Sequence, residues 1–143
     1  MAFENILVVC VGNICRSPIA ATLLMDKYPQ KNIDSAGLSA VIGHQADIKA
    51  QEVLKEDSLD MSDHIAKQID EELVVTADLI LTMSVNQSKW IEGRWPHCRG
   101  KTFRIGHWLD IDIADPYQRD KSVFEATRKD IIDSLELWYD KIG

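Results

Sequence analysis

A run of apolar residues near the start of the chain leads into a helical pattern through a very short link. Residues 6–11 carry no charge, which is typical of a buried strand. Pro18 begins a second stretch, residues 19–28, whose apolar side chains recur at helical spacing. Gly12 and Asn13 indicate a turn between the two. A strand followed by a turn and a helix is the repeating unit of open α/β sheets.

Strand patterns and helix patterns alternate along the rest of the chain. Further apolar runs predict strands at residues 33–36, 79–83 and 102–105. Helices are expected at residues 47–57, 71–75, 86–93 and 122–142. Because alternating strands and helices are joined by right-handed crossovers, we expect a doubly wound, four-stranded parallel sheet with helices on both faces. Ligands bind such sheets at the carboxyl ends of the strands, where the first loop is expected to lie.

Composition limits the class of protein. The chain length fits one domain, residues 1–143. No uncharged run approaches the length of a membrane span, so we expect no membrane insertion. The net charge of −7 argues against nucleic-acid binding as the main role. An odd number of cysteines, 3, favours a reducing compartment over a disulfide scaffold, so a cytoplasmic protein is expected.

The link between the first strand and the first helix has the composition of an oxyanion site. It reads Cys10-Val-Gly-Asn-Ile-Cys-Arg16-Ser17. Backbone N–H groups of a tight loop and the positive end of a helix dipole attract an anion, and Arg16 can hold two of its oxygens. The same groups and a Ser17 hydrogen bond favour a Cys10 thiolate, so Cys10 is expected to be a nucleophile. The expected phosphate-binding residues are Val11, Gly12, Asn13, Ile14, Cys15, Arg16 and Ser17.

Two observations limit the value of this motif. Cys10 could instead be a buried strand residue, since free cysteines are often part of the core. Cys98 and Arg104 also repeat the six-residue spacing of the motif. Cys98 follows Trp95-Pro96-His97 rather than a strand, however, and no helical pattern follows Arg104. The context therefore favours the first copy.

Cleavage of a phosphate monoester through a cysteine also needs an acid for the leaving group. Asp115 is the best candidate, because Pro116 keeps it extended and Tyr117 can form an aromatic wall for a substrate ring. The alternative is that Asp115 only caps a turn before the last helix. Asp110 and Asp112 are expected to be solvated loop carboxylates. No histidine or third carboxylate shows ligand spacing, so neither a metal site nor a cofactor is expected.

Over essentially its whole length, the chain resembles the low-molecular-weight protein tyrosine phosphatases. The resemblance lies in the Cys10 to Ser17 motif, in Asp115-Pro116-Tyr117, and in residues 33–37, 64–69 and 78–83. Residues 100–102 and 106–110 are most similar to the bacterial branch linked to capsule and exopolysaccharide export. That branch acts on autophosphorylating tyrosine kinases, so the implied partner is a phosphotyrosine protein of this kind.

The resemblance also implies a role for each motif residue. Cys10 attacks phosphorus, Arg16 binds the phosphoryl group, and Asp115 first protonates the phenol and then activates water. A covalent phosphocysteine lies between the two steps.

For the loop itself, the resemblance implies that Asn13 holds its shape through a side-chain network with Ser17 and His64. Taken alone, His64 is an ordinary surface or core histidine. Cys15 matches a second loop cysteine of the family, which implies a reversible disulfide with Cys10. A small packing residue is the alternative.

Departures from the animal members of the family concern the outer pocket. Gln118 stands where those members carry a second tyrosine, and residues 39–42 are aliphatic where they place an aromatic residue. Substrate preference is therefore expected to differ from theirs.

Two rival functions share part of the pattern. An arsenate reductase on this fold needs a further pair of cysteines, and only Cys98 lies outside the loop. A phosphocarrier would accept a phosphoryl group on cysteine without hydrolysis, and it would need neither Arg16 nor Asp115.

Overall fold

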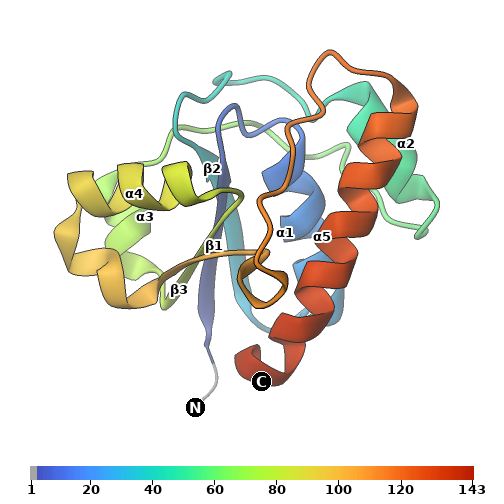
Figure 1. Ribbon diagram of the computed structural model, residues 1–143. Helices are drawn as coiled ribbons and strands as arrows, with labels where there is room; N and C mark the ends of the chain where they lie inside the picture. The colour runs from blue at the N-terminus through green and yellow to red at the C-terminus, as the bar shows by residue number, and fades with distance from the viewer. Residues whose placement is uncertain (1–2) are drawn as a thin grey trace.

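Four parallel strands form the centre of the molecule (Figure 1). The computed structural model describes residues 3–143. The strands run in the spatial order β2-β1-β3-β4, which confirms the predicted doubly wound parallel sheet. Their bounds are β1 (Asn5–Cys10), β2 (Asn32–Gly37), β3 (Leu79–Thr82) and β4 (Thr102–Arg104).

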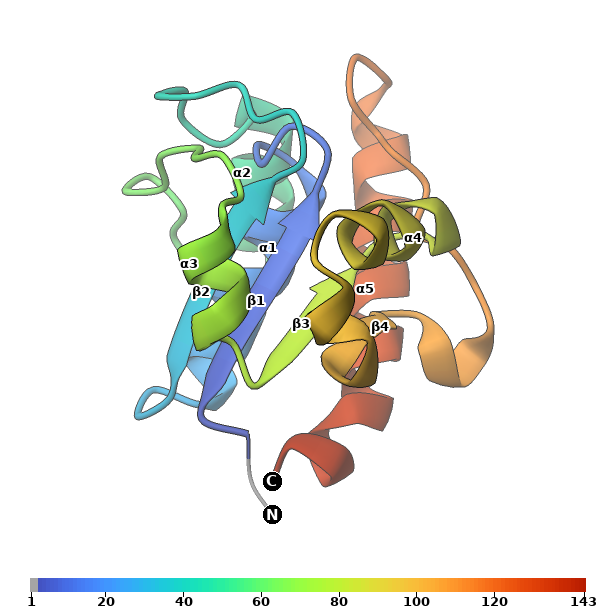
Figure 2. The same ribbon diagram turned by 90° about the vertical axis from the view of Figure 1, so that its left-hand side faces the viewer.

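Helices cover both faces of the sheet, as the alternating pattern predicts (Figures 1 and 2). One face carries the three helices α1 (Arg16–Lys27), α2 (Ile48–Lys55) and α5 (Lys121–Ile142), which pack against one another. The other face carries α3 (Glu71–Thr76) and α4 (Val85–Arg94), which face the viewer in Figure 2. Two short 3₁₀ helices, Pro96–Lys101 and His107–Leu109, were not anticipated from the sequence.

Successive residues of β1 supply two separate cores, because side chains alternate across a strand. Ile6 and Val8 pack with α1, α2 and α5. Leu7 and Val9 pack with α3 and α4 on the opposite face. This double burial explains why the strand reads as a continuous apolar run rather than as an alternating one.

Side-chain caps define where three helices begin. Asp47 accepts from the Lys49 amide at 2.9 Å before α2, and Ser84 accepts from the Gln87 amide at 3.2 Å before α4. Asp70 caps α3 in the same way. No side chain caps the start of α1. The N–H groups of its first turn are therefore free to face an anion.

The first strand ends at the point where the order of the sheet reverses. The chain places β2 on one side of β1 and β3 on the other, and this switch point is where open α/β sheets bind ligands. Figure 1 shows the segments after β1 and β2 together at the upper end of the sheet. Within residues 3–143, no helix has the length and apolar character needed to cross a membrane.

Candidate active site

Asn13 stands at the centre of the loop that joins β1 to α1. Its φ of 60° lies in the left-handed region, which asparagine tolerates better than most residues. Its buried side-chain amide donates to the hydroxyl oxygens of Ser17 at 2.7 Å and Ser35 at 3.0 Å. Its side-chain oxygen accepts from the amide of Lys67 at 3.0 Å. The loop is therefore held to α1, to β2 and to the segment before α3.

The side chain of His64 supports the same loop by contacting the backbone of Asn13. The Nε2 atom lies 2.7 Å from the carbonyl oxygen of Asn13, so Nε2 must carry the proton and donate it. Burial lowers the pKa of His64 below its ordinary value, which favours this neutral form. The structure thus brings Asn13, Ser17 and His64 together, with the hydrogen bond of His64 made to the Asn13 backbone rather than to either of the two side chains.

Sequence reasoning missed two residues of this network, Ser35 and Lys67. Ser35 lies opposite Val8 in the parallel register of β1 and β2. The sequence did offer one signal for Ser35, because it is a polar residue near the end of the predicted strand at residues 33–36. Lys67 contributes only its backbone N–H, which no side-chain pattern reveals.

Cys10 ends β1 with its sulfur on the floor of the loop. The residue is 3% exposed, and Sγ lies 3.0 Å from the Ser17 hydroxyl and 3.3 Å from the backbone nitrogen of Asn13, which donates to it. Cys15 is buried as well, and both cysteines are free. Burial raises the pKa of the Cys15 thiol far above its ordinary value, so Cys15 stays protonated. Its disulfide with Cys10 stays a prediction.

Arg16 begins α1 and extends across the mouth of the loop. Its Nη1 donates to the carbonyl oxygen of Ile113 at 2.7 Å, and its Nη2 lies 3.7 Å from Oδ2 of Asp115. Its buried Nε has no hydrogen-bond partner among residues 3–143. A buried N–H group without a partner is costly. An oxyanion above Cys10 would supply the missing acceptor.

Asp115 lies between the loop and solvent. Its side chain is 50% exposed and faces Arg16 through Oδ2, while Oδ1 accepts from the Tyr117 amide at 3.1 Å. The two readings of Asp115 are therefore compatible, because one carboxylate oxygen caps a turn and the other faces the site. Together with the loop, Asp115 and Tyr117 line a pocket of about 160 Å³. Its lining residues are Cys10, Val11, Gly12, Ile14, Cys15, Arg16, Ser39, Val41, Asp115 and Tyr117.

The second copy of the motif forms no comparable site. Cys98 is fully buried in the first 3₁₀ helix, and Arg104 pairs with Asp110 at 2.7 Å and Asp112 at 3.1 Å. Asp110 and Asp112 are exposed loop carboxylates, as predicted, with 92% and 53% of their side-chain surface exposed, and both also accept hydrogen bonds from Arg104. The sequence could not show that Arg104 pairs with these two aspartates, because no local sequence pattern predicts the turn of the chain that brings them together.

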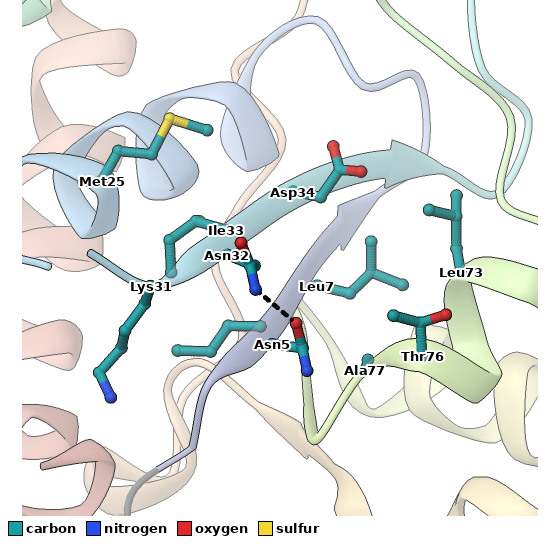
Figure 3. Close-up of a pocket in the computed structure, with 11 residues that line it drawn as sticks. Asn5, Leu7, Met25, Lys31, Asn32, Ile33, Asp34, Leu73, Thr76 and Ala77 are labelled. Atoms are coloured by element: carbon teal, nitrogen blue, oxygen red, sulfur yellow. Dashed lines mark hydrogen bonds between the residues drawn. The ribbon is translucent and has the colours of Figure 1, made fainter. Parts of the chain in front are cut away.

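A further pocket of about 400 Å³ opens along the outer edge of β2 (Figure 3). It contains none of the residues predicted to act in catalysis. Lys31, at its rim, already donates to the Phe3 carbonyl at 2.7 Å. The chemistry is therefore concentrated in the smaller pocket at the end of β1.

A buried cysteine under an uncapped helix start, with an arginine and a carboxylate at the mouth, defines a cysteine-based, phosphate-handling enzyme on a parallel sheet. The family model for low molecular weight phosphotyrosine protein phosphatase matches residues 5–143. The chain belongs to this family of hydrolases.

Individual relatives agree with this assignment. The low molecular weight protein-tyrosine-phosphatase Ptp of Acinetobacter johnsonii is 57% identical over 127 residues, which cover 89% of each chain. The tyrosine phosphatase Wzb of Escherichia coli K30, solved in complex with sulphate, is 37% identical with a TM-score of 0.94 over 99% of each chain. The YwlE arginine phosphatase of Geobacillus stearothermophilus is 34% identical with a TM-score of 0.91, covering 97% of this chain and 92% of that one.

Proposed function

We propose that this protein hydrolyses phosphotyrosine in proteins through a phosphocysteine intermediate on Cys10. The observation that carries the proposal is the convergence of three groups on one small pocket: the Cys10 sulfur, the Arg16 guanidinium and the Asp115 carboxyl. Each group supplies one requirement of the reaction, namely a nucleophile, an oxygen clamp and a proton donor.

In the first step, the Cys10 thiolate attacks phosphorus. The S–P bond forms as the P–O bond to the phenol breaks, and Asp115 gives its proton to the departing phenolate oxygen. The loop N–H groups of residues 11–16 and the free Nε of Arg16 bind the equatorial oxygens, on which negative charge is spread.

In the second step, water attacks the phosphocysteine. Asp115, now a carboxylate, takes a proton from that water, and the S–P bond breaks to release phosphate and the thiolate. The Ser17 hydroxyl, 3.0 Å from the sulfur, donates a hydrogen bond to the leaving thiolate. Neither step uses a metal or a cofactor.

The pocket supports an aryl substrate. Tyr117, Val11 and Val41 give it an apolar wall, and its volume of about 160 Å³ is small. A flat ring between apolar walls can reach the sulfur at the bottom of such a pocket. The sulphate in the Wzb structure supports oxyanion binding, since sulphate has the shape and charge of phosphate.

The partner we propose is an autophosphorylating tyrosine kinase of polysaccharide export. We propose that the two proteins interact in the cytoplasm. The support is the similarity to Wzb and to other relatives of the exopolysaccharide-associated branch. Three buried free cysteines fit a reducing compartment. Incubation with an autophosphorylated kinase domain tests the proposal. We expect the wild type, but not Cys10→Ser, to remove its phosphotyrosine, and a kinase left phosphorylated beside a hydrolysed peptide would refute this partner.

The activity is tested with peptides that carry phosphotyrosine, phosphoserine or phosphoarginine, in the presence of a chelator. We expect the wild type and Cys98→Ser to hydrolyse phosphotyrosine, and Cys10→Ser to be inactive. Cys98→Ser is a matched control, because Cys98 is equally buried and lies outside the pocket. Hydrolysis of phosphoarginine alone would refute the tyrosine assignment. An inert wild type would refute the hydrolase and leave arsenate reduction or phosphoryl carriage.

A further inference from the structure

Arg104, at the end of β4, forms the centre of a charged cluster beside the site that the mechanism above does not use. Its side chain is only 17% exposed, and it donates from Nη2 to Asp110 at 2.7 Å and from Nη1 to Asp112 at 3.1 Å. The hydrogen bond that Arg104 donates to Asp110 raises the pKa of Arg104 above its ordinary value. A guanidinium held by two carboxylates in this way has little freedom to move.

Asp112 connects the cluster to a second element. Its Oδ1 also accepts from the backbone N–H of Val85, the first residue of α4, at 3.1 Å. The carboxylate thus compensates an otherwise unpaired donor at the start of that helix and is favoured by the helix dipole. Asp110 makes no such contact, and its side chain is 92% exposed.

Ile113, the residue after Asp112, leads directly to the catalytic arginine. Its N–H donates to the Met83 carbonyl at 2.8 Å, and its carbonyl oxygen accepts from Arg16 Nη1 at 2.7 Å. The orientation of the Arg16 guanidinium therefore depends on the position of one peptide group. The Asp112 contacts lie one residue away from that group.

The segment before Asp112 is folded tightly back on itself. The Ile111 N–H donates to the Gly106 carbonyl at 3.1 Å, and a Cβ atom on Gly106 would lie 2.3 Å from the Ile111 carbonyl oxygen. Asp110 has a φ of 54°, which is unfavourable for a residue with a side chain. Such a turn persists only where other contacts hold it, and Arg104 supplies two of them.

Few hydrogen bonds hold the segment between Ile113 and Asp115 in place. Thr127 donates to the Ala114 carbonyl at 3.5 Å, and Asp115 accepts from the Tyr117 amide within its own turn. The place of the Asp115 carboxyl therefore depends on the anchored chain two residues earlier, on its own turn and on Arg16, whose Nη2 lies 3.7 Å from Oδ2.

We propose that Arg104 and Asp112 are positioning residues, which fix the Ile113 carbonyl and thereby aim Arg16 and place Asp115. This inference rests on the proposed function, because its effect is exerted on the two groups that bind the phosphoryl group and protonate the phenol. A displacement of about 1 Å in such groups can lower the rate by a factor of about 100.

The dependence of the rate on the leaving group separates positioning from simple stabilisation. A well-placed acid makes kcat/KM nearly independent of the pKa of the leaving phenol, because the leaving oxygen takes up the proton of the acid as it departs and leaves as neutral phenol. A displaced acid makes kcat/KM fall as that pKa rises. The measurement is the slope of log kcat/KM against leaving-group pKa for a series of aryl phosphates, alongside thermal unfolding of each variant.

The sharpest comparison is between Asp112→Asn and Asp110→Asn. Both remove one negative charge and one ion pair to Arg104, and asparagine tolerates the left-handed backbone at position 110. Only Asp112 also holds α4. We expect Asp112→Asn to steepen the slope and to lower kcat/KM for the poorest leaving group about tenfold. We expect Asp110→Asn to retain the wild-type slope.

Variants of the arginine complete the test. Arg104→Gln is expected to match Asp112→Asn, and Arg104→Lys, which keeps the charge, is expected to recover part of the wild-type slope. Arg128→Gln is a matched control: Arg128 is 21% exposed and binds Asp57 through two hydrogen bonds of 2.7 and 2.6 Å, outside the pocket. We expect it to lower the unfolding temperature without changing the slope.

Wild-type slopes in folded Asp112→Asn and Arg104→Gln, beside an active wild type, would overturn the positioning role and leave the proposed function intact. An equal change in Asp110→Asn or Arg128→Gln would overturn it too, since general loosening would then explain the effect. A wild type that hydrolyses no aryl phosphate would refute the proposed function and this inference together.

Discussion

The sulfur of Cys10 and the hydroxyl oxygen of Ser17 lie 3.0 Å apart, and both residues are buried at the loop that joins β1 to α1. Asn13 donates to the same hydroxyl oxygen at 2.7 Å. A Cys10 thiolate can only accept a hydrogen bond, so the Ser17 hydroxyl must donate to the sulfur when Cys10 is ionised. The thiolate form of Cys10 thus has a donor prepared for it.

Ser17→Ala is expected to slow the breakdown of the phosphocysteine, because the departing thiolate loses this donor. A hydrogen bond to a charged group contributes about 1.5–3 kcal/mol, so kcat should fall about 10- to 160-fold. The measurement is steady-state kcat together with the size of the initial product burst. Ser134→Ala is the control, since Ser134 is an equally buried serine on α5 whose hydroxyl has no partner within residues 3–143. Equal kcat values for the wild type and Ser17→Ala would contradict the role of Ser17.

Asp115→Asn is expected to lower kcat/KM on a phosphotyrosine peptide about 100- to 10,000-fold, which is the usual contribution of an acid placed at a leaving group. The loss should be much smaller for an ester of an acidic phenol, which departs without a proton. Asp120→Asn, an exposed carboxylate before α5 whose side chain makes no cap contact, should match the wild type. A phosphocarrier would barely respond to Asp115→Asn, and that outcome would count against hydrolysis.

Asn13→Ala is expected to lower the free energy of unfolding by about 2–4 kcal/mol. Alanine is strained at a φ of 60° by about 1–2 kcal/mol, and the substitution leaves the Lys67 amide without an acceptor at further cost. Urea unfolding provides the measurement. Asn13→Gly removes the same side chain but relieves the backbone strain, so it should be the more stable of the two variants. The reverse order would show that the left-handed backbone is not the cause.

The stability of the protein is expected to depend on pH through His64. Burial holds the pKa of His64 in the folded state below the value of 6.5 that it has when unfolded. The unfolded chain therefore binds the proton more readily, so this contribution to stability is present above pH 6.5 and declines as the pH falls below it.

His64→Gln should remove that part of the decline, measured as urea unfolding between about pH 7.5 and pH 5. His97→Gln, at an exposed histidine far along the chain, should retain it. A wild-type slope in His64→Gln would contradict the assignment.

The strands, the main helices and the short loop between β1 and α1 could be predicted because each is determined by local pattern. The apolar runs, the turn at Gly12-Asn13 and the helical spacing after Pro18 all lie within a few residues of what they specify. The parallel direction of the strands follows from general rules for crossovers, whereas their order in the sheet was not predicted. The two short 3₁₀ helices have no comparable pattern and were missed.

Contacts between distant segments could not be predicted. Ser35 reaches Asn13 through the register of β2 on β1, and Ile113 reaches Arg16 across 97 positions of sequence. Both contacts depend on how separate elements are placed in space. The pairing of Arg104 with Asp112 is a contact of the same kind. In the sequence Arg104 only repeats the spacing of the first motif, and its proposed positioning role depends on this contact.

The most direct test of the central claim is mass spectrometry of the enzyme, quenched with acid within milliseconds of mixing with an excess of aryl phosphate. We expect one phosphoryl group on the peptide that contains Cys10, present in the wild type and in Cys98→Ser and absent from Cys10→Ser. Release of the phenol with no phosphoryl group on Cys10, or with the group on another residue, would contradict it.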